Sequence, residues 1–104
     1  MSTTTIAGHE VEVNEEGFLT RPDQWSEELA PELASLIGIE LTDKHWELIR
    51  FLRTDHAAQG ETATLRRVPT QTGPPVTELF GLFPGKPAKK MAYVSGLPKP
   101  KGCV

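Results

Sequence analysis

The sequence predicts a small, mainly helical α+β domain with an N-terminal β-hairpin and an irregular C-terminal arm. Three patterns predict this class: strand-like alternation in residues 9–13, helically spaced apolar residues over residues 29–94, and a tail of proline, glycine and lysine. The 104 residues suffice for one modest core. We therefore expect a helical domain with the hairpin over residues 1–94, and a mobile arm over residues 95–104.

The predicted hairpin joins residues 4–6 to residues 9–13 through a turn at Ala7 and Gly8. Apolar and charged side chains alternate in the second strand, which is the period of a strand with one buried face. Glycine tolerates the positive φ that such a turn requires. A further turn is expected at residues 14–17.

The first predicted helix has one apolar face, formed by Leu29, Leu33, Leu36 and Ile37. We expect it to begin near Ala30, because Pro31 fits best in a first helical turn. Ser26 is a candidate cap and Gly38 a natural stop.

The second predicted helix has the clearest pattern. Thr42 is placed to cap its N-terminus, Asp43 lies in its first turn, and Gly60 ends it. Three shorter helices are expected at residues 63–67, stopped by a proline at position 69, at residues 76–83, and at residues 87–92. In the second of these, one apolar face is expected from Val76, Leu79, Phe80 and Phe83.

The composition excludes several classes of protein. No apolar run approaches the ~20 residues that span a bilayer, and Met1 to Thr5 lack the pattern of a secretory signal. The net charge of −3 argues against direct nucleic-acid binding. One cysteine forms no internal disulfide, which favours a cytoplasmic setting. Neither a nucleotide-binding loop nor metal-ligand spacing is present, so we expect no cofactor and no metal.

The single thiol, Cys103, stands one residue from the C-terminus on the arm. Chain ends are usually exposed, so position alone makes a functional and an incidental thiol about equally plausible. Lys99 and Lys101 would lower the pKa of Cys103, while the Val104 carboxylate would raise it, and the two effects roughly cancel. An activated Cys103 would therefore need a pocket on this protein or on a partner.

Other side chains have simpler structural interpretations. His45, Trp25 and Trp46 are expected to pack in or against the core. Arg66 and Arg67 are typical of a solvated face, with contact to an anion or thiolate as the alternative.

Several motifs resemble the DsrC/TusE family of small sulfur-carrier proteins, from about Ile6 to the end of the chain. In the first half they are Glu15-Glu16-Gly17-Phe18-Leu19, Trp25, Gly38-Ile39 with Leu41-Thr42, His45-Trp46-Glu47 and Leu52-Arg53. In the second half they are Arg66, Leu82-Phe83-Pro84-Gly85, Pro87-Ala88-Lys89, Gly96-Leu97-Pro98-Lys99-Pro100 and Gly102-Cys103-Val104. The long tail motif makes the resemblance specific.

The resemblance implies an orthogonal helical bundle with an N-terminal hairpin and a mobile C-terminal arm. It implies that Cys103 carries sulfur as a persulfide, with Arg66, Lys99, Lys101 and Gly102 as the thiol environment and arm. Members similar to TusE accept sulfur from a TusBCD-like complex, or a DsrEFH-like one, and pass it toward the enzyme that makes 2-thiouridine in tRNA. Members similar to DsrC serve dissimilatory sulfite reductase, which is the alternative. The expected activity is that of a sulfurtransferase acting with partners, and whether the chain alone is an enzyme stays open.

A missing second cysteine separates the two branches. In two-cysteine members of the resembled family it lies eleven positions before the last one, where this chain has Ala92. Without it, no intramolecular disulfide or trisulfide forms, and transfer to another protein's thiol remains. Other departures are Lys86, Lys101, Thr54-Asp55 and Thr70, the last standing where a lysine is expected. Arg66 would then be the main cation near the thiol.

Two further hypotheses compete with a sulfur carrier. In the first, the arm regulates or scaffolds a sulfite-reductase-like complex without carrying sulfur. A helical bundle with a hairpin can also imitate a winged-helix DNA-binding protein, although the acidic charge opposes this.

Overall fold

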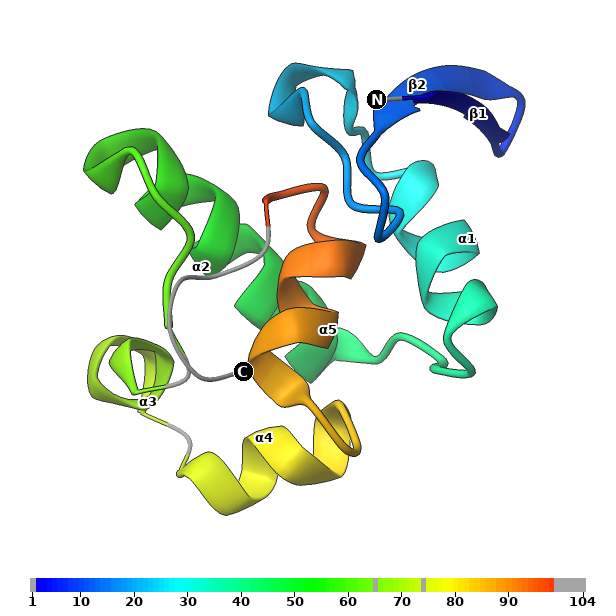
Figure 1. Cartoon of the computed structure of the whole chain (residues 1–104). Helices are drawn as coiled ribbons and strands as arrows, with labels where there is room; N and C mark the ends of the chain where they lie inside the picture. The colour runs from blue at the N-terminus through cyan, green and yellow to red at the C-terminus, as the bar shows by residue number, and fades with distance from the viewer. Residues whose placement is uncertain (1, 65, 74, 99–104) are drawn as a thin grey trace.

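The computed structural model describes residues 2–64, 66–73 and 75–98 (Figure 1). The expected α+β class with an N-terminal hairpin is confirmed. In the described residues the elements are β1 (Ser2–Ile6), β2 (His9–Val13), the 3₁₀ helix η1 (Pro22–Gln24), α1 (Leu29–Leu36), α2 (Asp43–Gln59), α3 (Arg67–Thr72), α4 (Val76–Leu82) and α5 (Pro87–Val94).

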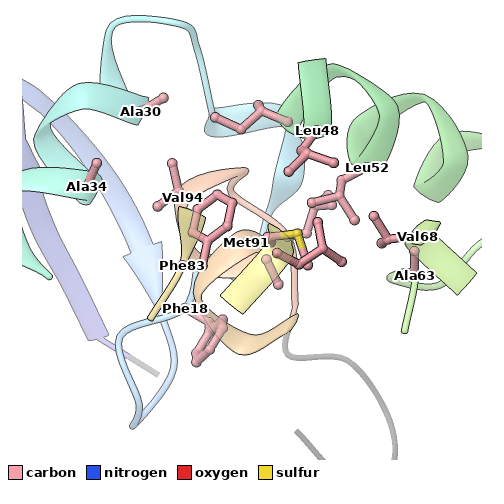
Figure 2. Close-up of a cluster of buried hydrophobic side chains, with 14 residues drawn as sticks. Phe18, Ala30, Ala34, Leu48, Leu52, Ala63, Val68, Phe83, Met91 and Val94 are labelled. Carbon is pink, nitrogen blue, oxygen red and sulfur yellow. The ribbon is translucent and has the colours of Figure 1, made fainter. Parts of the chain in front are cut away.

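Helix α5 organises the bundle. It contacts α1, α2 and α4, and Figure 1 shows it in the middle of the other helices. The core gathers around its buried side chains Met91 and Val94, with Phe83 from the preceding segment and Leu48 and Leu52 from α2 (Figure 2). Since α5 runs directly into the C-terminal segment, the core fixes where that segment starts.

The hairpin follows the predicted pattern. Strands β1 and β2 pair antiparallel, with Ile6 opposite His9 across the turn. Both turn residues have positive φ, 51° at Ala7 and 81° at Gly8, as a two-residue turn that matches the strand twist requires. Val11 is buried against α1 residues in a second apolar cluster.

The predictions for helix α1 are confirmed in part. Gly38 ends it as predicted: at φ 74° its N–H bonds to the Ser35 carbonyl, and the next N–H bonds back to Ala34. The predicted cap at Ser26 is wrong, because Leu29 N–H bonds to its backbone carbonyl and no side chain caps the helix. Leu36 is 66% exposed, contrary to expectation. The buried face is rotated away from it, toward the small Ala30 and Ala34.

The predictions for the next helices held in part. Helix α2 begins and ends as predicted, between Thr42 and Gly60. The helix expected at residues 63–67 is wrong: α3 starts at Arg67 and contains Pro69 in its first turn, where a missing N–H costs no helical bond. Of the apolar face expected on α4, Val76 and Phe80 are exposed, at 38% and 44%.

His45 joins two helices. Its ring is buried, accepts the Thr42 backbone N–H at Nδ1 over 3.0 Å, and donates from Nε2 to the Leu82 carbonyl over 2.8 Å. A carbonyl oxygen only accepts, so the proton is on Nε2. The expectation that His45 is a packed side chain is confirmed, and its contacts tie the start of α2 to the end of α4.

His45→Gln should lower the free energy of unfolding by about 1–2 kcal/mol. Glutamine still reaches back to the Thr42 N–H, as in a capping box, but leaves the Leu82 carbonyl without its donor. Urea unfolding measures the loss. His56→Gln, on the same helix, is the matched control and should change stability by less than about 0.5 kcal/mol. Equal losses in the two variants would contradict this role.

Candidate functional site

The predicted nucleophile Cys103 lies outside the described residues, together with Lys99, Lys101 and Gly102. The described chain ends at Pro98. The part of the candidate site open to structural description is therefore the start of the arm, residues 95–98, which we call the arm root. Three side chains from distant parts of the sequence hold it and the residue before it: Trp25 bonds to Val94, Arg53 to Ser95, and Thr62 to Pro98.

Trp25 and Arg53 hold the last turn of α5 and the residue after it. The indole Nε1 of Trp25 donates to the Val94 carbonyl over 2.9 Å. The Arg53 guanidinium stacks 4.2 Å from the centre of the Trp25 ring and donates to the Ser95 carbonyl over 2.8 Å and to the Pro22 carbonyl over 3.0 Å. Burial lowers the pKa of Arg53. The planar guanidinium group of Arg53 thus connects α2, η1 and the arm root.

Gly96 lets the chain turn away from α5. Its φ is 69°, and a Cβ at this position would lie 2.4–2.5 Å from three atoms of the Trp25 side chain. The Leu97 N–H bonds back to the Ala92 carbonyl over 3.0 Å, and the Leu97 side chain is buried. Gly96 therefore meets two demands at once, a left-handed backbone and close contact with an indole.

Thr62 holds Pro98, the last described residue of the chain. Its hydroxyl donates to the Pro98 carbonyl over 2.8 Å, from the irregular segment between α2 and α3. All four residues of the arm root thus lie against the bundle, although the sequence places them in a mobile arm. The division at residue 94 and the mobility of the arm stay predictions, since the remaining arm residues are outside the described ranges.

Next to Thr62, the two adjacent arginines have different roles. Arg67 makes a two-point ion pair with the buried Asp55 carboxylate, with contacts of 2.7 and 3.0 Å, and the hydrogen bond to Asp55 raises the pKa of Arg67. Arg66 is exposed and has no ion-pair partner among the described residues. Thr70, at the expected lysine position, donates to the Arg67 carbonyl. Arg66 is therefore the arginine of this pair that is available for an anion.

The sequence had indicated only part of this site. Trp25 was expected against the core, where it packs. Of the two arginines expected on a solvated face, Arg66 is exposed, whereas Arg67 pairs with the buried Asp55 carboxylate. The placement of Arg66 in the thiol environment stays a prediction. Arg53 and Thr62 were given no role, because their partners are backbone carbonyls far away in the sequence, which no local pattern reveals. The signal that was present is Gly96, directly after a helical segment.

Neither a metal-binding cluster nor a membrane-spanning helix is found in the described part of the chain. No three His, Cys, Asp or Glu side chains there lie close enough together to hold a metal ion. None of its helices combines the length and apolar character required to cross a membrane.

The geometry defines a class: a small helical bundle that locks the first residues of a C-terminal arm in place. The family model described as "DsrC like protein" matches residues 5–104. The chain belongs to this DsrC-like family.

Relatives and solved structures cover almost the whole chain. It is 36% identical to proteins named Sulfurtransferase TusE from Escherichia coli (strain K12) and Salmonella typhi, over 93% of this chain and 95% of each relative. The NMR structure of Allochromatium vinosum DsrC superposes with a TM-score of 0.84 at 33% identity, covering 99% of this chain and 98% of the other. The structure of the oxidized gamma-subunit of the dissimilatory sulfite reductase (DsrC) from Archaeoglobus fulgidus superposes with a TM-score of 0.82 at 32% identity. The match covers 99% of this chain and 100% of the other.

Proposed function

We propose that this protein is a sulfur-relay carrier that holds persulfide sulfur on Cys103 and passes it to a partner thiol. The observation that carries the proposal is the family match over residues 5–104, which includes Cys103, together with 36% identity to proteins named Sulfurtransferase TusE. The arm root supports it physically, because a fixed starting point limits where the thiol can travel.

The relay needs no oxidant. The Cys103 thiolate attacks the outer sulfur of a donor persulfide, the donor S–S bond breaks, and the donor leaves as a thiolate. An acceptor thiolate then attacks the outer sulfur of the Cys103 persulfide and releases the Cys103 thiolate. Each step exchanges one S–S bond for another, so the redox state of the pair is unchanged.

The single cysteine favours relay toward tRNA 2-thiouridine synthesis. The second cysteine expected in sulfite-reductase partners is replaced by Ala92, whose side chain is fully buried on α5. The donor would be a TusBCD- or DsrEFH-like complex and the acceptor a tRNA-thiolating enzyme, in the cytoplasm. The alternative is a DsrC-like subunit or regulator of sulfite reductase or another sulfur-oxidation complex, favoured by the likeness to the gamma-subunit of dissimilatory sulfite reductase.

Mass spectrometry tests the loading step. After incubation with a persulfide-loaded TusBCD-like complex, the chain should gain one sulfur atom on Cys103, and Cys103→Ser should gain none. A matched control is Cys103→Ser combined with Ala92→Cys, which keeps one thiol but places it at a buried position. Equal loading of this control, or a Cys103→Ser protein that still supports thiolation in a reconstituted relay, would contradict the carrier function.

Arg66 is expected to assist the thiol. Arg66→Gln should slow sulfur transfer to Cys103 by about threefold to tenfold, because a nearby cation stabilises the attacking thiolate. The pH dependence of Cys103 alkylation by a neutral reagent should move to higher pH. Arg50→Gln, another exposed arginine, should leave both measurements unchanged. Identical profiles for Arg66→Gln and the unmodified protein would remove Arg66 from the thiol environment.

A further inference from the structure

A second candidate site lies beside the start of α5. A depression of about 390 Å³ opens between the turn after β2, the end of α1 and the first turns of α5. Its apolar floor is formed by Phe18, Ile37 and Tyr93, and its rim by Lys86, Lys89, Lys90 and Glu16. We call it the lysine pocket.

The floor is apolar, with one polar group. Phe18 is almost fully buried and meets Tyr93 edge-on, with ring centres 5.7 Å apart. Tyr93 is only half-buried, so its ring also faces the pocket. Burial raises the pKa of Tyr93, and its phenol therefore remains a hydrogen-bond donor at neutral pH. Such a floor fits an apolar side chain whose neighbours accept hydrogen bonds.

The rim is cationic in a chain whose net charge is −3. Three lysines and one glutamate line this rim. Lys89 lies 3.5 Å from Glu16, and Lys90 donates to the Pro84 carbonyl. Lys86 is exposed and has no ion-pair partner in the described ranges. The rim therefore keeps unneutralised positive charge next to an apolar floor.

We propose that the lysine pocket binds an acidic segment of a partner protein, with an apolar side chain on the floor and flanking carboxylates at the lysines. Charge complementarity selects this occupant. A nucleic acid would bring many phosphates toward a chain that is acidic overall, which the electrostatics oppose. A single acidic segment places its negative charge only where the cations are.

The pocket is placed to act together with the arm without obstructing it. The rim lysines lie before and within the first turn of α5, whereas the arm root follows its last turn, about 12 Å along the helix. Figure 1 shows the turn that precedes α5 on the side of this helix away from α3. One partner can therefore hold the bundle at the lysine pocket while the arm reaches a separate point on it, which raises the effective concentration of the thiol.

A peptide titration tests the proposal. The probe is a short synthetic peptide with one leucine between two pairs of glutamates, added to ¹⁵N-labelled protein and followed by NMR. Amide shifts should concentrate at the lysine pocket, and added salt should weaken binding. Lys86→Glu should weaken it by about fivefold, and Arg21→Glu, with the same charge change at a residue that does not line the pocket, by less than twofold. Cys103→Ser should bind like the unmodified protein, so the result is independent of sulfur loading.

Several results would overturn the proposal. One is equal affinity for a peptide in which serines replace the glutamates. Another is an equal effect of Lys86→Glu and Arg21→Glu. Tighter binding of a single-stranded RNA oligonucleotide at the same amides would assign the pocket to a nucleic acid. A homodimer that Lys86→Glu dissociates would assign it to a second copy of the chain.

Discussion

Gly96→Ala is expected to lower the free energy of unfolding by about 2–5 kcal/mol. The left-handed backbone at φ 69° costs a residue with a side chain about 1–2 kcal/mol. The new methyl group would also lie 2.4–2.5 Å from the Trp25 side chain, which must move, at a cost of about 1–3 kcal/mol. Since Trp25 supports Arg53, the displacement would loosen the arm root as well. Urea unfolding measures the first effect, and limited proteolysis after residue 94 the second.

Two other glycines separate these causes. Gly38 and Gly60 have φ of 74° and 77°, also end helices, and have open space where a Cβ would stand. Gly38→Ala and Gly60→Ala should therefore show only the backbone cost of about 1–2 kcal/mol, with no change in proteolysis of the tail. If all three variants lose the same stability, the contact with Trp25 has no energetic significance.

Arg53→Met should lower the free energy of unfolding by about 3 kcal/mol. Methionine fills similar space but leaves the Ser95 and Pro22 carbonyls without donors, and a hydrogen bond to a charged group contributes about 1.5–3 kcal/mol. The stacking on Trp25 is lost as well. In the proposed relay, sulfur transfer from Cys103 should also slow, because the arm would leave the bundle from a less defined point.

The controls for Arg53 lie on the same helix. Arg50 is exposed and lies over Trp46 at 5.9 Å, so Arg50→Met should cost less than about 1 kcal/mol. Arg53→Lys keeps the charge but not the two-pronged geometry, and should fall between the other two variants. A lysine variant as stable as the unmodified protein would show that charge alone holds the arm root.

Local signals in the sequence predicted most of the fold. The hairpin turn at Ala7 and Gly8, the cap at Thr42 and the stop at Gly60 each depend on one or two residues and their neighbours, so pattern and propensity suffice. On α1, the error arose because tertiary packing decides which face is buried. Leu36 fits an apolar helical face by spacing, yet the alanines that approach α5 set the face that is buried.

The candidate site was harder to predict than the fold. Its proposed nucleophile, Cys103, was predicted from motif and position and stays a prediction. The groups that hold the arm root come from residues 25, 53 and 62 and meet only in three dimensions. Their acceptors are backbone carbonyl oxygens. Because every residue has one, the sequence does not show which of them will accept a hydrogen bond. Pairing a distant arginine with the Ser95 carbonyl requires the packing of α2 against α5.

The hydrogen bond between Thr62 and Pro98 limits how far the Cys103 sulfur can lie from the bundle. Only five peptide links separate Pro98 from Cys103, so the chain spans at most about 17 Å beyond that anchor. Any active site that exchanges sulfur with this protein must come within that radius of the same point. In the proposed relay, donor and acceptor would therefore both have to approach the same region of the surface around Pro98.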